Sequence, residues 1–354
     1  DDLEGLVGSE MCIRDRVLGL SLLSSAIADT WQFDDGERVI AISDVHGDYN
    51  AMVATLGSAG VINDDGEWTA GAGHLVITGD LLDRGPDSRK VMDLVMRLES
   101  LAADDGGQVH LLLGNHEVMN LVGDLRYVAV EEYAAFAADE DPGERELWFQ
   151  RYFSGQPPLT DEAGAREAWN ADRPPGFFAH RRAFRSDGHY GGWLKEKPLI
   201  VVINGTAFVH GGLSPQVAEL GLQGVNGHLK AELVEYIEQL EVLNDAGLMP
   251  PGVNFYDHDN LLDGLGDDPS RPADVSAAID AVQRLNGSDL HAPDSPLWYR
   301  GNVGCGALIE MDRLLPVLDA IGASRVVIGH TPTLTRQVLS RLDGRVVEID
   351  TGML

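Results

Sequence analysis

The chain has 354 residues, of which 44% are hydrophobic, and its 57 acidic and 26 basic side chains give a formal charge of −31. This length allows one large or two modest domains, and the hydrophobic content is enough for a sizeable core. The charge excludes nucleic acids and anionic membrane surfaces as partners, because both require basic patches. Since Cys12 and Cys305 are the only cysteines, a framework of several disulfides is also excluded.

The N-terminal residues 1–28 are expected to lie outside the folded domain. Residues 1–16 lack a start Met and resemble translated sequencing-adapter sequence, so we exclude them as an artefact. Residues 17–28 form an apolar run ending in Ala-Ile-Ala, which is typical of a secretory signal peptide cleaved after Ala28. This run is too short to span a bilayer, and no other apolar stretch is long enough. We therefore expect a periplasmic or secreted protein; if the run is instead a buried first helix, the protein is cytoplasmic.

From residue 29 to residue 354 we expect one domain, in which five short apolar runs each end in a polar motif. The runs are residues 39–42, 75–78, 111–113, 208–209 and 326–328. The motifs are Ser-Asp-Val-His-Gly (43–47), Gly-Asp-Leu-Leu-Asp-Arg-Gly (79–85), Gly-Asn-His-Glu (114–117), His-Gly-Gly (210–212) and Gly-His-Thr (329–331). A short apolar run that stops at Gly, Asp or Asn is typical of a buried strand entering a loop. Polar side chains at several strand ends indicate an α/β protein with its active site there.

The polar residues at the first two strand ends are ligands that hard or borderline divalent metal ions prefer. Asp44 and His46 are two residues apart, so their side chains leave from the same face and can reach one ion. Asp80 has two carboxylate oxygens and can bridge two ions. Two ions about 3.5–4 Å apart can clamp a phosphoryl group.

The later strand ends supply ligands for a second ion. Asn115 offers a neutral amide oxygen, and His210 and His330 would complete the set. His116 is adjacent to Asn115, so the two side chains should point in different directions. One of them can bind metal while the other faces the substrate.

Three polar residues in these motifs remain without a ligand role. Protonated His116 near a leaving oxygen would be a general acid, and Asp83 is a candidate for the carboxylate that fixes its tautomer and raises its pKa. Arg84 offers a planar guanidinium to phosphate oxygens.

The set of motifs resembles that of the metallophosphoesterase (calcineurin-like) superfamily, and within it the phosphoprotein phosphatase type. Glu117, the His-Gly-Gly-Leu of residues 210–213 and the Pro-Leu-Trp-Tyr-Arg of residues 296–300 are most similar to the bacterial Shewanella-like protein phosphatases. The similarity runs from about residue 39 to the C-terminus. Ser43 departs from the Gly that is usual in the eukaryotic enzymes, at a position that is not a ligand.

The resemblance implies an α/β/β/α sandwich of two mixed sheets with helical insertions over the site. It implies two divalent ions, Mn, Fe or Zn, and a metal-bridging hydroxide as the nucleophile. One ion would be held by Asp44, His46 and Asp80, and the other by Asp80, Asn115, His210 and His330. The resemblance also implies His116 with Asp83 as the acid pair, and Arg84 and Arg300 on the phosphate.

Two insertions interrupt the expected core, at about residues 128–192 and 224–294. The first lies between the Asn-His and His-Gly-Gly motifs, so we expect it to fold over the mouth of the site, where loops often carry specificity. Its three arginines leave two interpretations open, local salt bridges or contact with substrate. They are Arg181, Arg182 and Arg185.

Three smaller features complete the expectations. Asp257-His258-Asp259 in the second insertion is expected to be a surface turn rather than a metal site. Cys305 is expected to be a small buried or half-buried residue rather than a reactive thiol. Residues 346–349 form a last predicted strand, and we expect natural sequence beyond Leu354 because this family usually continues past such a strand.

These residues predict a metal-dependent phosphomonoesterase that acts on a phosphoprotein or phosphopeptide, at Ser/Thr or at Tyr. Two alternatives stay open: hydrolysis of a small phosphoanhydride, as in bis(5′-nucleosyl)-tetraphosphatases, and an inactive module that binds a phospho-ligand. Glu117 counts against the tetraphosphatases, which tend to have Asp after Asn-His. The negative charge is explained either by solubility or by a preference for basic phosphopeptides.

Overall fold

The structure is a computed structural model, which describes residues 31–353. The adapter-like residues 1–16, Cys12 and the predicted signal peptide at residues 17–28 lie outside this range. Within residues 31–353, no helix combines the length and the apolar character that crossing a bilayer requires.

The smaller of two sheets consists of three parallel strands, in the order β2 (Val39–Ile42), β3 (His74–Ile77) and β4 (Gln108–Leu111). Val, Ile and Leu dominate these strands, and all four residues of the central β3 are buried. Such continuous apolar runs are typical of parallel strands that are covered on both faces. The run predicted at residues 111–113 is displaced, because β4 ends at Leu111 and residues 112–113 already form the connection to Gly114.

The larger sheet has six strands in the order β1-β5-β6-β7-β9-β8. Their bounds are β1 (Gln32–Phe33), β5 (Ile200–Ile203), β6 (Thr206–Val209), β7 (Arg325–Ile328), β8 (Leu339–Arg341) and β9 (Val346–Glu348). The sheet is mixed: β5 with β6 and β8 with β9 are antiparallel, whereas the other pairs are parallel.

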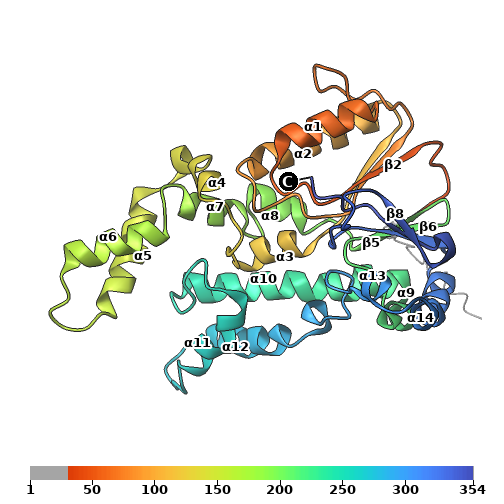
Figure 1. Cartoon of the computed structure of the whole chain (residues 1–354). Helices are drawn as coiled ribbons and strands as arrows, with labels where there is room; N and C mark the ends of the chain where they lie inside the picture. Colours follow the sequence, from red (N-terminus) through yellow and green to blue (C-terminus); the bar gives the residue numbers. More distant parts are fainter. Residues whose placement is uncertain (1–30, 354) are drawn as a thin grey trace, which may run out of the picture. The chain divides into compact units, whose positions relative to one another are not determined.

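An apolar cluster joins the two sheets. Val76 and Leu112 from the smaller sheet side pack with Val201, Phe208 and Val327 from the larger one. On the outer face of the smaller sheet lie α1 (Tyr49–Ser58) and α2 (Ser88–Asp104), and α9 (Pro215–Gly224) and α14 (Ala307–Ala320) lie against the larger sheet (Figure 1). The predicted α/β class and layered arrangement of the fold are confirmed. The remaining short helices outside the insertions are α3 (Asn115–Val122), α13 (Gly301–Gly304) and the 3-10 helix η5 (Leu342–Gly344).

The first insertion is helical, and part of it projects from the sheets as the pair α5 and α6 (Figure 1). Its elements are α4 (Val130–Ala134), η1 (Ala137–Asp139), α5 (Pro142–Ser154), α6 (Glu162–Asp172), α7 (Phe177–Ala183) and α8 (His189–Leu194). It has an aromatic core of its own, made by Tyr133, Phe149, Trp169, Phe177 and Phe178.

The second insertion is built on α10, which packs against α12. Its elements are the π-helix η2 (Val225–Leu229), α10 (Lys230–Asp245), η3 (Phe255–Asp257), α11 (His258–Asp263), α12 (Ala273–Asn286) and η4 (Asp289–His291). The expectation of a surface turn at Asp257-His258-Asp259 is wrong for His258, which is 1% exposed. Its Nδ1 lies 2.8 Å from the hydroxyl of Tyr236 on α10, so this contact joins α11 to α10 within the second insertion.

Candidate active site

The five motifs meet because the strands before them are parallel within each sheet. The loops that follow β2, β3 and β4 leave the same edge of the smaller sheet, and those that follow β6 and β7 leave the same edge of the larger one. The six predicted metal ligands and both members of the acid pair are all buried at this place. They are Asp44, His46, Asp80, Asp83, Asn115, His116, His210 and His330.

Five of these residues hold a backbone conformation that is rare for residues other than glycine. The φ angles are 50° at Asp44, 49° at His46, 55° at Asp80, 70° at Asp83 and 68° at His330. Each such residue costs on the order of 1 kcal/mol, and such residues concentrate at functional sites. Backbone bonds hold the turns, as from His46 N to Asp80 O at 3.0 Å. The sharp turn at each strand end directs the side chain into the space between the loops.

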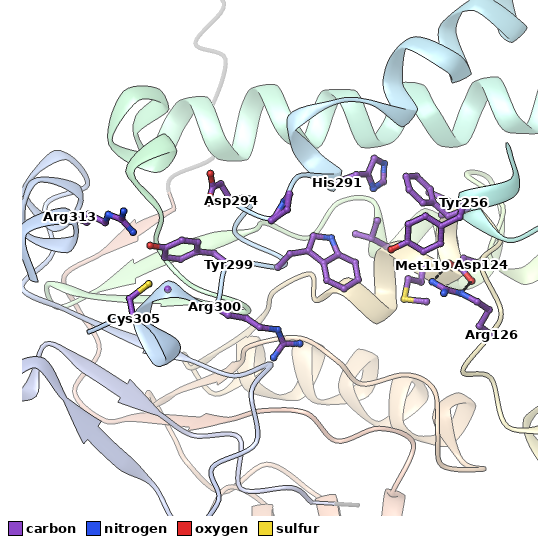
Figure 2. A pocket seen from close by; sticks show the side chains of 16 residues that line it. Met119, Asp124, Arg126, Tyr256, His291, Asp294, Tyr299, Arg300, Cys305 and Arg313 are labelled. Atoms are coloured by element: carbon purple, nitrogen blue, oxygen red, sulfur yellow. Dashed lines mark hydrogen bonds and ion pairs between the residues drawn. The ribbon is translucent and has the colours of Figure 1, made fainter. Parts of the chain in front are cut away.

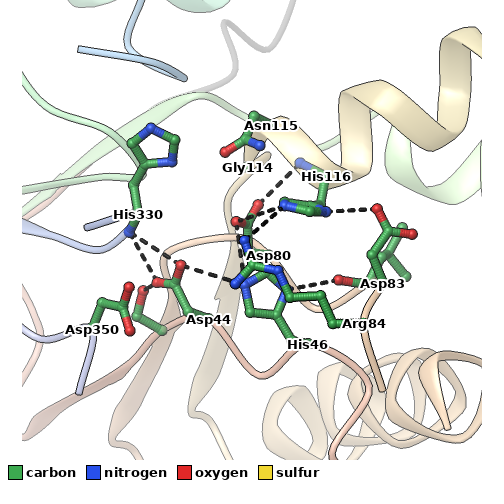
Figure 3. Close-up of polar contacts among 12 residues, drawn as sticks. Asp44, His46, Asp80, Asp83, Arg84, Gly114, Asn115, His116, His330 and Asp350 are labelled. Carbon is green, nitrogen blue, oxygen red and sulfur yellow. Dashed lines mark hydrogen bonds and ion pairs between the residues drawn. The ribbon is translucent and has the colours of Figure 1, made fainter. Parts of the chain in front are cut away.

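Asp80 lies at the centre of the cluster (Figure 3). Its Oδ2 is 3.8 Å from His46 Nε2, 3.9 Å from His116 Nε2 and 3.3 Å from His210 Nε2. Its Oδ1 accepts a hydrogen bond from the backbone N–H of His116 at 3.0 Å. The carboxylate therefore faces two groups of nitrogen ligands at once, which is the position that a bridging ligand needs.

Backbone carbonyls fix which nitrogen of two histidines is free. His46 Nδ1 is 2.9 Å from Leu82 O, and His210 Nδ1 is 2.8 Å from Thr78 O. A carbonyl only accepts, so each Nδ1 carries a proton, and Nε2 is the nitrogen that can offer a lone pair to a metal ion. This arrangement is common among metal-binding histidines.

Acceptor atoms also come close together in the second ligand group, which consists of Asn115, His210 and His330 beside Asp80. His210 Nε2 is 2.8 Å from Asn115 Oδ1 and 3.1 Å from His330 Nδ1, and His330 Nε2 is buried without a hydrogen-bond partner among residues 31–353. Acceptors this close need a cation or a proton between them. Burial lowers the pKa of His210, yet the carboxylates of Asp80 and Asp44 raise it overall to about 9. The residues thus fit a divalent ion, which would displace that proton.

The first ligand group, Asp44, His46 and Asp80, contains two buried carboxylates. Asp44 Oδ1 is 3.9 Å from His46 Nε2, and Asp44 also accepts from the backbone N–H of His330 and the hydroxyl of Ser43. Burial, together with the like charge of Asp80, raises the pKa of Asp44 to about 7. A divalent cation beside Asp44 would remove this penalty.

His116 is held by a carboxylate on the side away from Asp80. Its Nδ1 is 2.6 Å from Asp83 Oδ2, and Asp83 Oδ1 accepts from Asn120 Nδ2 at 2.8 Å. Burial opposes protonation, but Asp80 and Asp83 raise the pKa of His116 overall. One ring nitrogen of His116 also lies within 4.8 Å of ligand atoms of His46 and Asp80, as the ligand atoms of Asp80, His210 and His330 do among themselves. Geometry alone therefore fits His116 either as an acid or as a ligand.

Both predicted phosphate-binding arginines are exposed beside the buried cluster. Arg84 Nη2 lies 3.4 Å from His116 Nε2. Arg300 Nη1 donates to Thr331 Oγ1 at 2.8 Å and to His330 O at 3.3 Å. Their guanidinium groups can therefore reach an anion bound over the cluster.

The sequence analysis gave no role to three residues of the site. Buried Glu117 accepts from the backbone N–H groups of Asp80, Leu81 and Gly114, and so holds the β3 loop against α3. Its place three residues after Gly114 is a capping-box spacing that signals such a role. Asn120 is one helical turn after His116, which also could have been noticed. Asp350, beside Asp44 in Figure 3, follows β9 as the predicted ligands follow their strands.

The expectation that the first insertion folds over the mouth of the site stays a prediction; its helix α4 contacts the start of α2, where Glu132 accepts from the backbone N–H of Ser88. The cavity beside the cluster is lined by Phe255, Tyr256 and His291 of the second insertion, and none of its lining residues within the described chain comes from residues 128–192. The arginines of the first insertion make local contacts. Arg181 donates to Asn120 O at the end of α3, Arg182 pairs with Glu144, and Arg185 pairs with Asp245.

Comparisons with known proteins agree with this geometry. The family described as calcineurin-like phosphoesterase matches residues 37–334. An uncharacterised protein of Schizosaccharomyces pombe is 28% identical over 328 residues, which cover 89% of this chain and 73% of that protein. Shewanella-like protein phosphatase 2 of Arabidopsis thaliana is 30% identical over 213 residues, 56% of this chain and 52% of that protein, so the match spans about half of that relative.

A solved structure is similar over most of the chain. The cold-active protein-tyrosine phosphatase of a psychrophilic Shewanella species aligns with 91% of this chain and 73% of its own, at 28% identity and a TM-score of 0.59. The resemblance to Shewanella-like phosphatases is thereby confirmed.

Proposed function

The chain belongs to the calcineurin-like phosphoesterase family and is a metal-dependent phosphatase, and from this premise we propose that it hydrolyses phosphoproteins at a dinuclear centre. The observation that carries the proposal is the position of Asp80, whose Oδ2 faces nitrogen atoms of both ligand groups. One ion would be held by Asp44, His46 and Asp80. The other would be held by Asp80, Asn115, His210 and His330.

The metals suit the donor atoms present. Carboxylate, imidazole and amide ligands fit Mn, Fe or Zn, and such ions would supply water activated at neutral pH and charge to offset the phosphoryl oxygens. The residues of the chain do the rest. Arg84 and Arg300 bind the phosphate, because both guanidinium groups lie exposed beside the cluster.

His116 protonates the leaving oxygen in this proposal, and Asp83 positions it. The 2.6 Å contact keeps the proton of the imidazole on Nδ1 when Nε2 has given up its own. The carboxylates of Asp80 and Asp83 raise the pKa of His116 against the effect of burial, which favours the protonated form that a general acid needs.

Phosphotyrosine is the phosphoester that the surroundings favour. The ring of Tyr127 lies 5.2 Å from the ring of His116, and 47% of Tyr127 is exposed, so an aryl group could stack beside the acid. The similar Shewanella enzyme is a protein-tyrosine phosphatase, which supports the same choice. Export to the periplasm, proposed from residues 17–28 alone, would make a scavenging role or an exported phosphoprotein the natural setting.

The test is a turnover panel on purified residues 29–354, with and without added Mn²⁺. It contains p-nitrophenyl phosphate, matched phosphoserine, phosphothreonine and phosphotyrosine peptides, and diadenosine tetraphosphate. We expect metal-dependent release of phosphate, fastest from phosphotyrosine. Turnover of the tetraphosphate alone would replace the proposal with a phosphoanhydride hydrolase, and binding without turnover of any substrate would indicate an inactive module.

A further inference from the structure

A cavity of about 580 Å³ lies beside the candidate site, between α3 and the second insertion (Figure 2). Its walls are largely aliphatic and aromatic. The main contributors are Val118, Met119, Phe255, Tyr256 and Trp298. A concave apolar space of this size is typical of a ligand site rather than of a packing defect.

The cavity adjoins the place where phosphate would bind. Arg300 lines it and also donates to Thr331 Oγ1, next to His330. Met119 on the opposite wall follows His116 by three residues, which is about 5 Å along a helix. The ring of Trp298 is 5.8 Å from that of His330. A group in the cavity would therefore belong to the same substrate molecule as the phosphate.

The walls of the cavity favour an apolar side chain over a chain of phosphates. Its acidic lining residues are Asp124 and Asp294, and its basic ones are Arg126, Arg300 and Arg313. Arg126 and Asp124 offset each other, because both of their contacts are 2.8 Å. Arg300 lies at the end next to His330, and Arg313 is 3.9 Å from Glu310. The rest of the lining is mostly aliphatic and aromatic, which suits an apolar group.

We propose that this cavity binds a large apolar or aromatic side chain of a phosphoprotein, close in sequence to the phosphorylated residue. The inference rests on the phosphatase function proposed above. Tyr256 forms part of the rim: it is 66% exposed, and the guanidinium of Arg126 lies 4.9 Å from its ring centre. A bound side chain would cover this ring, so Tyr256 determines selectivity without touching the phosphate.

The experiment uses phosphotyrosine peptides that differ at one position from two residues before to two residues after the phosphotyrosine. Each position carries either Phe or Asn. We expect Phe at one position to raise kcat/KM by roughly 10-fold, the scale at which an apolar pocket discriminates. In Tyr256→Ala this preference should fall to about 2-fold or less, through KM, while kcat/KM for p-nitrophenyl phosphate stays unchanged.

Tyr152→Ala is the matched control, because Tyr152 is a partly exposed tyrosine on α5 and does not line the cavity. It should keep the full preference. Equal turnover of the Phe and Asn peptides, or a preference that survives Tyr256→Ala, would overturn the inference and leave the phosphatase proposal standing. Tyr256→Ala that slows diadenosine tetraphosphate but no peptide would assign the cavity to a nucleoside instead. Failure of wild-type protein to hydrolyse any phosphomonoester with metal present refutes the phosphatase proposal itself.

Discussion

The imidazole of His116 makes its shortest polar contact, 2.6 Å, with Asp83, and its other nitrogen faces Arg84 and Asp80. If His116 is the acid, His116→Asn should keep both ions and slow hydrolysis of alkyl phosphates by roughly 10²–10⁴-fold. The loss should be smaller for p-nitrophenyl phosphate, whose leaving group is stable without a proton. Steady-state kinetics and metal analysis of the purified variant measure both effects.

The matched variant is Asp83→Asn, which should give a smaller loss with the same dependence on the leaving group, because Asp83 only positions and charges the imidazole. Equal losses on both substrates, or one missing ion in His116→Asn, would refute the acid role and make His116 a metal ligand or a structural residue; its distance to Asp80 also fits a ligand.

Asp80 supports a separate prediction about metal content. Because its carboxylate faces both ligand groups, Asp80→Asn should lower the metal bound per chain at both positions. Asn115→Ala should mainly weaken the ion near His210, since Asn115 Oδ1 contacts that group. Elemental analysis after dialysis, compared with wild type, gives the two stoichiometries. If Asp80→Asn keeps the metal content and the turnover of wild type, the ligand assignment is wrong.

At the scale of elements, Glu132 on α4 ties the first insertion to α2. Its carboxylate accepts from the backbone N–H groups of Ser88 and Arg89 at 2.9 and 3.0 Å, whereas Asp87 at the N-cap makes no side-chain cap bond. Glu132→Ala would leave two helix N–H groups without a partner and should lower the free energy of unfolding by about 1–3 kcal/mol. Urea denaturation followed by circular dichroism measures this change.

The exposed neighbour Glu131 offers the control on the same helix. Glu131→Ala should change stability by no more than about 0.5 kcal/mol. Similar losses in the two variants would mean that helix propensity in α4, rather than the bond to α2, explains the effect.

The elements also show what the sequence could and could not predict. Asp44, Asp80 and His210 were found because each follows a short apolar run, and parallel strands bring such ends together. The bond from Glu132 to α2 spans 44 residues and leaves no local period or motif to find. Phe255 and Tyr256 line the cavity from the second insertion, whose helix α10 contacts α3, and no local pattern in the sequence predicts this long-range packing.

At the scale of the whole molecule, repulsion among acidic side chains lowers the stability of the fold, whereas ion pairs raise it. The side chains behind the formal charge of −31 repel one another over long distances, whereas exposed ion pairs such as Arg166 with Glu146 contribute little to stability. Raising NaCl from about 0.01 M to about 1 M shortens the Debye length from about 30 Å to about 3 Å. Because screening weakens the repulsion more than the few pairs, Tm should rise with salt and then level off.

Calorimetry at saturating metal measures this rise, since salt then cannot act by releasing the ions. Sucrose at several concentrations is the comparison, because it favours compact states without screening charge. With added NaCl, Tm should rise most steeply below about 0.2 M, where the Debye length is longest and each addition of salt shortens it most. With added sucrose, Tm should rise without this early levelling off. A Tm that falls with NaCl would mean that ion pairs such as Arg166 with Glu146 and Glu162 stabilise the fold more than the repulsion destabilises it.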